Sequence, residues 1–395
     1  MSPGIYNKPY LMTAGPTPLP PAVSQVMAEP ILYHRAPAFI EIYERSLNGL
    51  KTVFQTENDV LSFAASGSGA LESAVANLVV AGEPAVVASA GKFGERWAEL
   101  CEAYGADLTH LEFEWGTKID PDEVDRALAG LDRPAKALFV TYSETSTGVL
   151  HDVETLARVA REHDTILAVD AVSAIGAVSL PQDEWDVDVV VAGSQKALMC
   201  PPGLAFASVS DRALEAAAAN PTGRYYFDWN KTATGQRKSP ADSPFTPAVS
   251  VWRALDVSLG MIEEEGLDNV FSRHAALARA ARAGVTAIGL ERFGPDDDNA
   301  NVVTAAYLPE SIDGAAVPKH MRDGLGITVA GGQGHLKGKI VRIAHCGYYG
   351  AFDIVVALTG LEMALIELGY ECVPGTAAGA AEKILIEAGS PEPVG

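Results

Sequence analysis

Between about residues 59 and 210, short apolar runs alternate with longer amphipathic stretches, and this alternation restricts the fold more than any other feature of the sequence. The apolar runs are rich in Val and Ala, as buried strands of a parallel sheet are, and the stretches between them have the period of helices. The predicted strands are DVLSFA, AVVAS, KALFVTY, TILAVD, DVVVAG and LAFASV, and helices are predicted over 70–80, 93–105 and 152–163. The pattern predicts an α/β fold with a mainly parallel sheet.

The length of the chain indicates two domains, because 395 residues with 48% hydrophobic content exceed one ordinary core. The expected division is an N-terminal arm over 1–20, a large domain over 21–260, a smaller α+β domain over 261–373 and a tail over 374–395. The tail is expected to add at most one short helix. Residues 211–247 contain a helix and then a polar, Pro-bearing segment, which we expect to be a long functional or interface loop.

Composition excludes several classes of partner and site. The 51 acidic and 29 basic residues give a formal net charge of −22, which argues against nucleic acid and against an anionic membrane as partners. Four scattered cysteines without ligand spacing indicate neither a disulfide framework nor a metal site, and they fit a reducing compartment. Because the sequence shows no signal-peptide run and no membrane-spanning stretch, we expect a cytoplasmic protein.

The segment VVVAGSQKAL, residues 189–198, places Lys196 just beyond a buried strand. Burial at that point lowers the pKa of a lysine and makes its neutral amine available as a nucleophile toward an aldehyde. A solvated lysine after a strand is the ordinary alternative, and this segment alone does not exclude it.

The segment TILAVDAVSA, residues 165–174, delivers Asp170 to the carboxyl end of another strand, where α/β folds collect their ligands. A carboxylate there is suited to keep a pyridinium nitrogen protonated, so that a bound ring acts as an electron sink. A capping Asp after a strand is the alternative reading.

The segment FAASGSGALESAVANL, residues 63–78, is a strand followed by a Gly/Ser turn that opens a helix. Backbone N–H groups at the helix start, with the hydroxyls of Ser66 and Ser68, form a cradle suited to one phosphate. Glu72 stands where the third glycine of a dinucleotide fingerprint would be, which argues against a nicotinamide dehydrogenase.

The segment KIVRIAHCG, residues 339–347, contains a strand on which Arg342 faces opposite to Val341 and Ile343. A guanidinium pairs in bidentate fashion with a carboxylate, so Arg342 is a candidate clamp for the α-carboxylate of a substrate. An exposed strand arginine is the alternative.

Seven segments together resemble the class V aminotransferases, most closely their alanine/serine:glyoxylate (serine:pyruvate) branch, over nearly all of residues 10–370. They are GPTPLP (15–20), ASGSGALES (65–73), SETSTGVL (143–150), AVDAVSAIG (168–176), AGSQKAL (192–198), FTPAVS (245–250) and GKIVRIAHCG (338–347). The resemblance implies a pyridoxal 5'-phosphate (PLP) enzyme of fold type I, with a mainly parallel seven-stranded sheet and a homodimer that shares its active sites. It implies a ping-pong Schiff-base transamination from a small amino acid, alanine or serine favoured, to a small 2-oxo acid, glyoxylate or pyruvate.

The same resemblance assigns roles to individual residues. Lys196 carries the cofactor, Asp170 pairs with the ring nitrogen, and Arg342 holds the substrate carboxylate. The other expected cofactor contacts are Ser68, Gly69 and Ala70 in the phosphate turn, Thr145 at the ring hydroxyl, Val172 under the ring, Gln195 at the phosphate and Thr246 from the other subunit. His34 and Arg35 match a position near the cofactor in relatives, although a surface helix start explains them equally well.

Two positions depart from the pattern of the relatives. Phe93 stands where relatives often place Trp over the ring, and it stacks without an indole N–H. Ala70 stands where some relatives have His, so that one phosphate contact is expected to be missing.

Two other functions compete with transamination. A cysteine desulfurase or lyase needs a mobile thiol near the cofactor, and Cys346 follows the Arg342 strand in a short segment. A non-catalytic subunit with this fold is the other alternative, because fold does not determine function.

Overall fold

The computed structural model describes residues 8–296 and 300–389. Its larger part is built on a seven-stranded sheet in the order β2-β10-β9-β8-β5-β3-β4. The strands are β2 (Asp59–Phe63), β3 (Pro84–Ser89), β4 (Asp107–Glu112), β5 (Ala137–Thr141), β8 (Ile166–Asp170), β9 (Val189–Gly193) and β10 (Ala205–Val209). Strand β10 runs antiparallel to β2 and β9, and the other neighbouring pairs are parallel. The predicted α/β fold with a mainly parallel sheet is confirmed.

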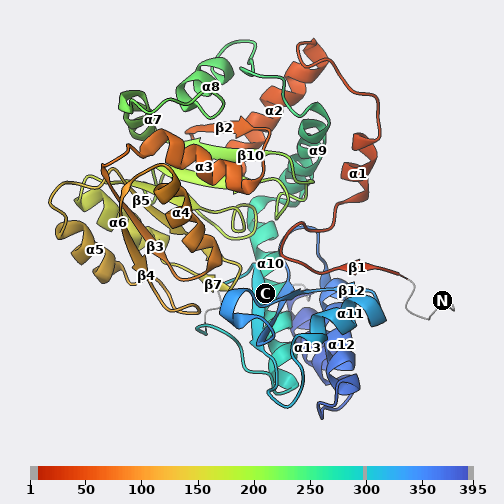
Figure 1. Ribbon diagram of the computed structural model, residues 1–395. Helices are drawn as coiled ribbons and strands as arrows, with labels where there is room; N and C mark the ends of the chain where they lie inside the picture. The colour runs from red at the N-terminus through yellow and green to blue at the C-terminus, as the bar shows by residue number, and fades with distance from the viewer. Residues whose placement is uncertain (1–7, 297–299, 390–395) are drawn as a thin grey trace, which may run out of the picture.

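Helices cover both faces of this sheet (Figure 1), because its strands are apolar on both sides. Leu138 and Val140 of β5 face one hydrophobic core, whereas Ala137 and Phe139 face the other. The first core includes residues of α2 (Pro37–Phe54), α5 (Pro121–Ala129), α6 (Val153–Glu162) and α9 (Val249–Glu265). The second includes residues of α3 (Gly67–Leu78), α4 (Lys92–Ala103), α7 (Asp211–Ala219) and α8 (Trp229–Gln236).

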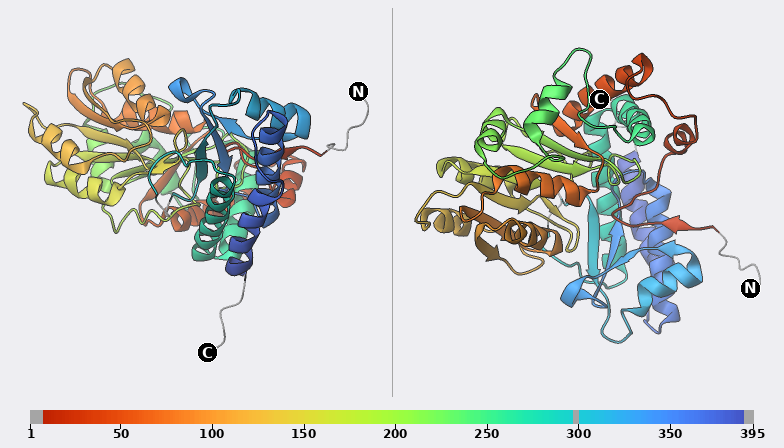
Figure 2. Two further views of the ribbon diagram at one scale, coloured as in Figure 1. Left: turned by 90° about the horizontal axis from the view of Figure 1, so that it is seen from below. Right: turned by 45° about the horizontal axis from the view of Figure 1, so that its top comes forward.

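The smaller part, coloured blue and teal, lies to one side of the large one (Figure 2). Its three-stranded antiparallel sheet has the order β11-β14-β13. Its elements are α10 (Leu267–Ala287), β11 (Val303–Tyr307), α11 (Ala316–Leu325), β12 (Ile327–Thr328), β13 (Ala330–Gly331), β14 (Ile340–Ala344), α12 (Ala351–Glu367) and α13 (Thr376–Gly389). Helix α13, in the segment expected to be a tail, packs along α10 and buries Ala377 and Ala381. No helix among the described residues is long and apolar enough to cross a membrane.

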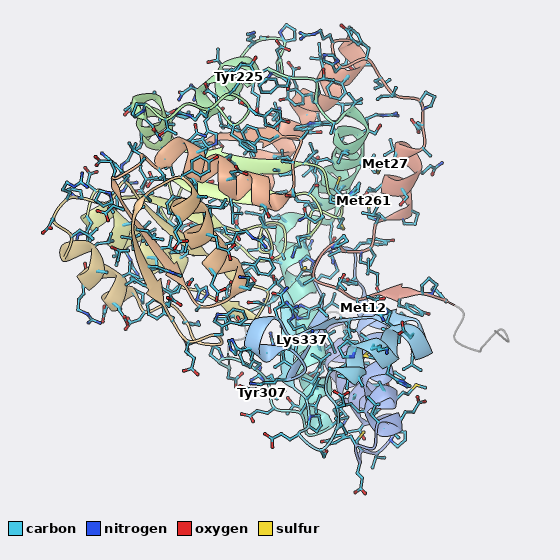
Figure 3. The ribbon with its side chains drawn as sticks, in the orientation of Figure 1. Met12, Met27, Tyr225, Met261, Tyr307 and Lys337 are labelled. Carbon is cyan, nitrogen blue, oxygen red and sulfur yellow. The ribbon has the colours of Figure 1, made fainter. Side chains whose placement is uncertain are left out.

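The segment from residue 10 to residue 17 connects the two parts. Strand β1 (Tyr10–Leu11) pairs in parallel with β12 of the small part. Met12 is buried in the small hydrophobic core and lies at the junction of the two parts (Figure 3). The Tyr349 hydroxyl donates a hydrogen bond to the carbonyl of Thr13, with an O···O distance of 2.8 Å. Helix α1 (Pro21–Met27) follows and packs against α9.

Three buried histidines are expected to make the fold less stable in acid. Burial lowers the pKa of His151, His274 and His345 from 6.5 to about 3. Between these two pKa values the unfolded chain binds more protons than the folded one, so stability falls as pH decreases through that window. At pH 5 each histidine is expected to lower the free energy of unfolding by about 2 kcal/mol relative to its value at neutral pH.

The prediction is checked by urea unfolding at several pH values for the wild type and for His151→Gln, whose side chain does not titrate. We expect the free energy of unfolding of the variant to decrease less steeply between pH 7 and pH 5. Equal slopes for the two proteins would contradict the assignment of a neutral His151.

Candidate active site

The carboxyl ends of the parallel strands bring the predicted residues together. Asp170 ends β8, and Lys196 follows β9 by three residues. The turn before α3 follows β2, Phe93 follows β3, and Thr145 follows β5 after the short strand β6 (Ser143–Glu144), which pairs with β7 (Val149–Leu150). Because all these strands point the same way, residues far apart in sequence meet at one edge of the sheet.

Lys196 is buried, with only 9% of its surface exposed. Its Nζ lies 3.3 Å from the hydroxyl oxygen of Ser173 and 5.8 Å from the ring centroid of Phe93. Burial lowers the pKa of Lys196, and the nearby Arg342 acts in the same direction. A larger fraction of neutral amine is therefore available than on a solvated lysine.

The N-terminal segment reaches the same lysine. The Thr17 hydroxyl donates to the carbonyl of Lys196 at 2.9 Å, and the Thr17 N–H donates to the carbonyl of Gln195 at 3.1 Å. Gly15 has a φ of +137°, and a Cβ there would lie 2.4 Å from Cε of Lys196. A glycine is required at this position for both its backbone conformation and the space that the lysine occupies.

Asp170 is buried at the end of β8, and one carboxylate oxygen accepts a hydrogen bond from the backbone N–H of Val172 at 2.9 Å. Burial raises the pKa of Asp170 to about 7, and the neighbouring Glu144 adds to this shift. Positive charge acts in the opposite sense, as Lys196 and Arg96 already do. This carboxylate is therefore well suited to a cationic ring nitrogen.

The turn before α3 has the properties of an anion site. Ser66 is the N-cap residue and makes no side-chain cap hydrogen bond, so the N–H groups of the first helical residues are not held by a cap. Ser68 is exposed, and its hydroxyl accepts from Nη1 of Arg96 at 3.1 Å. A Cβ on Gly67 would lie 3.0 Å from Cγ2 of Val172, which places Val172 against this turn. Helix start, hydroxyl and guanidinium together suit a phosphate group.

Gln195 and Ala70 are the other residues of this chain that are predicted to contact the phosphate. The Gln195 Oε1 atom is buried and has no hydrogen-bond partner among the described residues, so it can accept a hydrogen bond from a donor. Ala70 is fully buried and contributes to the core under α3.

Arg342 enters the site from β14 of the small part and is largely buried. Its Nε donates to the carbonyl of Gly331 at 2.9 Å, and its Nη1 donates to the carbonyl of Thr145 at 2.5 Å. Burial lowers the pKa of the guanidinium, but a group whose usual pKa is above 12 stays charged at neutral pH. The side chain therefore spans both parts of the molecule and places a fixed positive charge beside Lys196.

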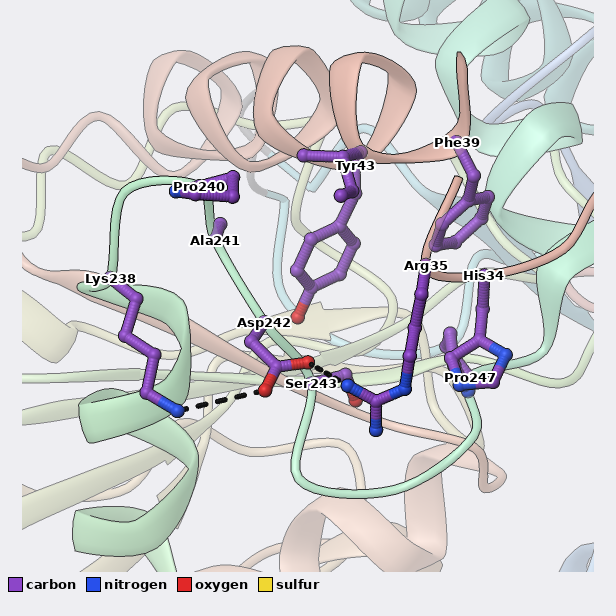
Figure 4. A pocket seen from close by; sticks show the side chains of 11 residues that line it. His34, Arg35, Phe39, Tyr43, Lys238, Pro240, Ala241, Asp242, Ser243 and Pro247 are labelled. Atoms are coloured by element: carbon purple, nitrogen blue, oxygen red, sulfur yellow. Dashed lines mark hydrogen bonds and ion pairs between the residues drawn. The ribbon is translucent and has the colours of Figure 1, made fainter. Parts of the chain in front are cut away.

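Three predicted residues lie elsewhere in this chain. Thr246 is exposed and lines a small pocket with Ala64 and Tyr226, and no side-chain hydrogen bond among the described residues joins it to Lys196. His34 and Arg35 lie just before α2 and line a different pocket of about 230 Å³ (Figure 4), where Arg35 pairs with Asp242 at 3.3 Å.

Sequence reasoning missed three residues of the site: Gly15, Arg96 and Glu144. Gly15 and Glu144 lie in segments that the resemblance covers, but the role of each of the three residues depends on a contact with a distant segment that no local pattern shows. Within residues 8–296 and 300–389, no group of three or more His, Cys, Asp or Glu side chains is arranged to hold a metal ion.

Comparison with known proteins gives four findings that bear on this site. The profile of the family described as aminotransferase class-V matches residues 9–344. The chain is 41% identical over 382 residues to the "Soluble hydrogenase, small subunit" of Synechococcus sp. (strain PCC 6716), covering 96% of this chain and 99% of that protein. It is 35% identical over 389 residues to serine–glyoxylate aminotransferase of Methylorubrum extorquens, covering 96% of each. The crystal structure of ureidoglycine–glyoxylate aminotransferase from Bacillus subtilis superposes with a TM-score of 0.90 at 31% identity, covering 95% of this chain and 98% of that one.

Proposed function

This chain belongs to the class V aminotransferases, and from that membership and its site we propose that it transfers an amino group from a small amino acid to a small 2-oxo acid with PLP as cofactor. Alanine or serine is the favoured donor, and glyoxylate or pyruvate the favoured acceptor. The observation that carries the proposal is a buried lysine of lowered pKa beside a buried aspartate, an uncapped helix start and a fixed arginine.

The residues around Lys196 fit PLP group by group. The start of α3, with Ser68 and Gly69, would hold the phosphate, and the Gln195 amide nitrogen would donate to it. Asp170 would keep a proton on the ring nitrogen, while Val172 and Phe93 would lie on the two ring faces. Thr145 would bond the ring hydroxyl. When bound, PLP supplies a conjugated ring that withdraws negative charge from the substrate Cα.

Lys196 has two tasks in this scheme. Its neutral amine would hold the cofactor through the aldehyde group, and as a free amine it would move the proton at the substrate Cα. Arg342 binds the α-carboxylate of the amino acid and then of the oxo acid, since both carry that group. One set of residues thereby serves both halves of a ping-pong cycle.

We further propose that two copies of the chain form a homodimer with shared sites. The exposed position of Thr246 supports this, because its motif assigns it to the phosphate of a site that it does not contact within its own chain. The location in the cytoplasm stays a prediction.

Cys346 gives little support to the desulfurase alternative. The side chain is fully buried, and burial raises the pKa of its thiol to about 11 even with Lys196 nearby. A desulfurase needs an accessible thiolate, which these surroundings disfavour. Sulfide release from cysteine by the purified protein would revive that alternative.

The test of the proposed function is the near-UV and visible absorbance of the purified protein before and after addition of alanine, serine or aspartate. We expect the visible band of lysine-bound PLP to be lost with one donor and to return when glyoxylate or pyruvate is added. Failure to bind added PLP would overturn the proposal. A protein that binds PLP but transfers no amino group would favour a subunit role, which the name of the Synechococcus relative also suggests.

A further inference from the structure

Glu144 is a completely buried carboxylate beside the site, and its hydrogen bonds tie two distant segments together. One oxygen, Oε2, accepts from the backbone N–H of Phe93 at 3.0 Å and from that of Gly94 at 2.9 Å. The other, Oε1, accepts from the N–H of Ser146 at 3.0 Å and from its hydroxyl at 2.5 Å. Burial raises the pKa of Glu144, and these four bonds reduce that rise without cancelling it, so the donors replace part of the water that the carboxylate has lost.

The first turn of α4 depends on this carboxylate. Gly91 is the N-cap residue and has no side chain to cap the helix. The free N–H groups of Phe93 and Gly94 bond to Glu144 instead, and that of Lys92 bonds to the Ser146 hydroxyl at 3.0 Å. Glu144, which lies on β6, thus caps the N-terminus of α4, the helix end that negative charge stabilises.

Gly91 leaves the space that the carboxylate needs. A Cβ at this position would lie 2.3 Å from Cγ of Glu144 and 2.4 Å from its carboxyl carbon. Any side chain at residue 91 would therefore displace the carboxylate from the helix start without changing its charge.

The first turn of α4 presents two groups to the site. The Phe93 ring lies near both Lys196, whose Nζ is 5.8 Å from the ring centroid, and Arg96, whose guanidinium carbon is 5.2 Å from it. Arg96 also donates to the Ser68 hydroxyl at 3.1 Å. A shift of this turn would move the ring and the guanidinium together.

We propose that Glu144 is a positioning residue that fixes the start of α4, and with it the Phe93 ring and the Arg96 guanidinium, against the cofactor. This inference rests on the proposed function, because it needs PLP as the occupant of the site. Glu144 touches neither cofactor nor substrate in this scheme and acts through the backbone of α4.

Two variants disturb the same contact in different ways. Glu144→Gln removes the negative charge and places an amide nitrogen against N–H donors. Gly91→Ala keeps the Glu144 carboxylate but fills the space that it occupies at the start of α4. Glu99→Gln is the matched control, because Glu99 lies on the same helix, is exposed and pairs with Lys92. If Glu144→Gln does not fold, Ser146→Ala is the milder replacement, since it removes the acceptor of the Lys92 N–H and one donor to Glu144.

The measurements are the Kd for PLP by absorbance titration and the visible circular dichroism per bound cofactor, which reports how the ring is held. We expect Glu144→Gln and Gly91→Ala to raise the Kd about 10- to 100-fold and to reduce the dichroism, while Glu99→Gln matches the wild type. Phe93→Leu should reproduce the loss of dichroism, because it removes the ring that Glu144 places.

The outcomes separate this inference from the proposed function. If the wild type binds PLP and both variants match Glu99→Gln in Kd and dichroism, the positioning role is wrong and the function stands. If the wild type itself does not bind PLP, both are wrong.

Discussion

Lys196→Ala is expected to lower the turnover rate by about 10³-fold or more, because this one side chain supplies both the bond to the cofactor and the proton transfer at the substrate Cα. The visible band of lysine-bound PLP should vanish as well. The fold should survive, since among the described residues the hydrogen bond that Nζ loses is a single one to the Ser173 hydroxyl. Steady-state rates and absorbance spectra of the purified variant check both expectations.

The matched control is Lys337→Ala, which removes an exposed lysine of the small part (Figure 3). It should behave as the wild type. A small primary amine added to Lys196→Ala should restore part of the turnover, because it can carry the missing proton through the space that the side chain leaves. Turnover of Lys196→Ala at the wild-type level would refute the assignment of the catalytic lysine.

Arg342→Ala is expected to lower kcat/KM by about 10²- to 10³-fold for the amino acid and the oxo acid alike, because both lose the same charged contact. Most of the loss should appear in KM if the guanidinium holds the carboxylate equally in ground and transition states. Steady-state kinetics with both substrates give the comparison.

A structural contribution must be separated from this effect, since Arg342 also donates to the carbonyls of Gly331 and Thr145. Loss of these bonds should lower stability by about 1–3 kcal/mol for each carbonyl left without a donor. Arg342→Lys keeps a charge but not the bidentate geometry, so its KM should lie between those of the wild type and Arg342→Ala. A normal KM for both substrates in Arg342→Ala would remove this residue from the site.

Much of the fold could be predicted because the buried strands are continuous apolar runs. Six of the seven large-sheet strands were identified in this way, and β4 was missed. The sequence of β4, DLTHLE, has only two apolar residues, because the strand pairs only with β3 at the sheet edge and its inner residues are only half-buried. Edge position is a property of the assembled sheet, so a test for apolar runs does not detect it.

Helix α8 was missed for a related reason, within the segment expected to be a loop. Its residues WNKTATGQ include weak helix formers, yet the Asp228 side chain caps the helix and Trp229 packs into the core. Tertiary burial outweighs local propensity here.

The candidate site shows the same division between local and distant signals. Lys196, Asp170 and Arg342 were named because each stands in a recognisable strand context. Glu144 lies in the same recognised segment as Thr145, but its part in the site depends on a helix that begins about fifty residues earlier. Such relations arise only when the chain has folded.

The bridge formed by residues 10–17 has a consequence for the order in which the site is made. Strand β1 can pair only after β12 has been synthesised, and the carbonyl of Thr13 can accept its hydrogen bond only after Tyr349 has been synthesised. Gly15 can therefore take its place beside Lys196 only when almost the whole chain has left the ribosome. Synthesis from the N-terminus therefore completes the reactive pocket late, after the sheet that carries Lys196 can already form. In an unfinished polypeptide Lys196 is therefore not yet buried by the N-terminal segment, and burial is what lowers its pKa.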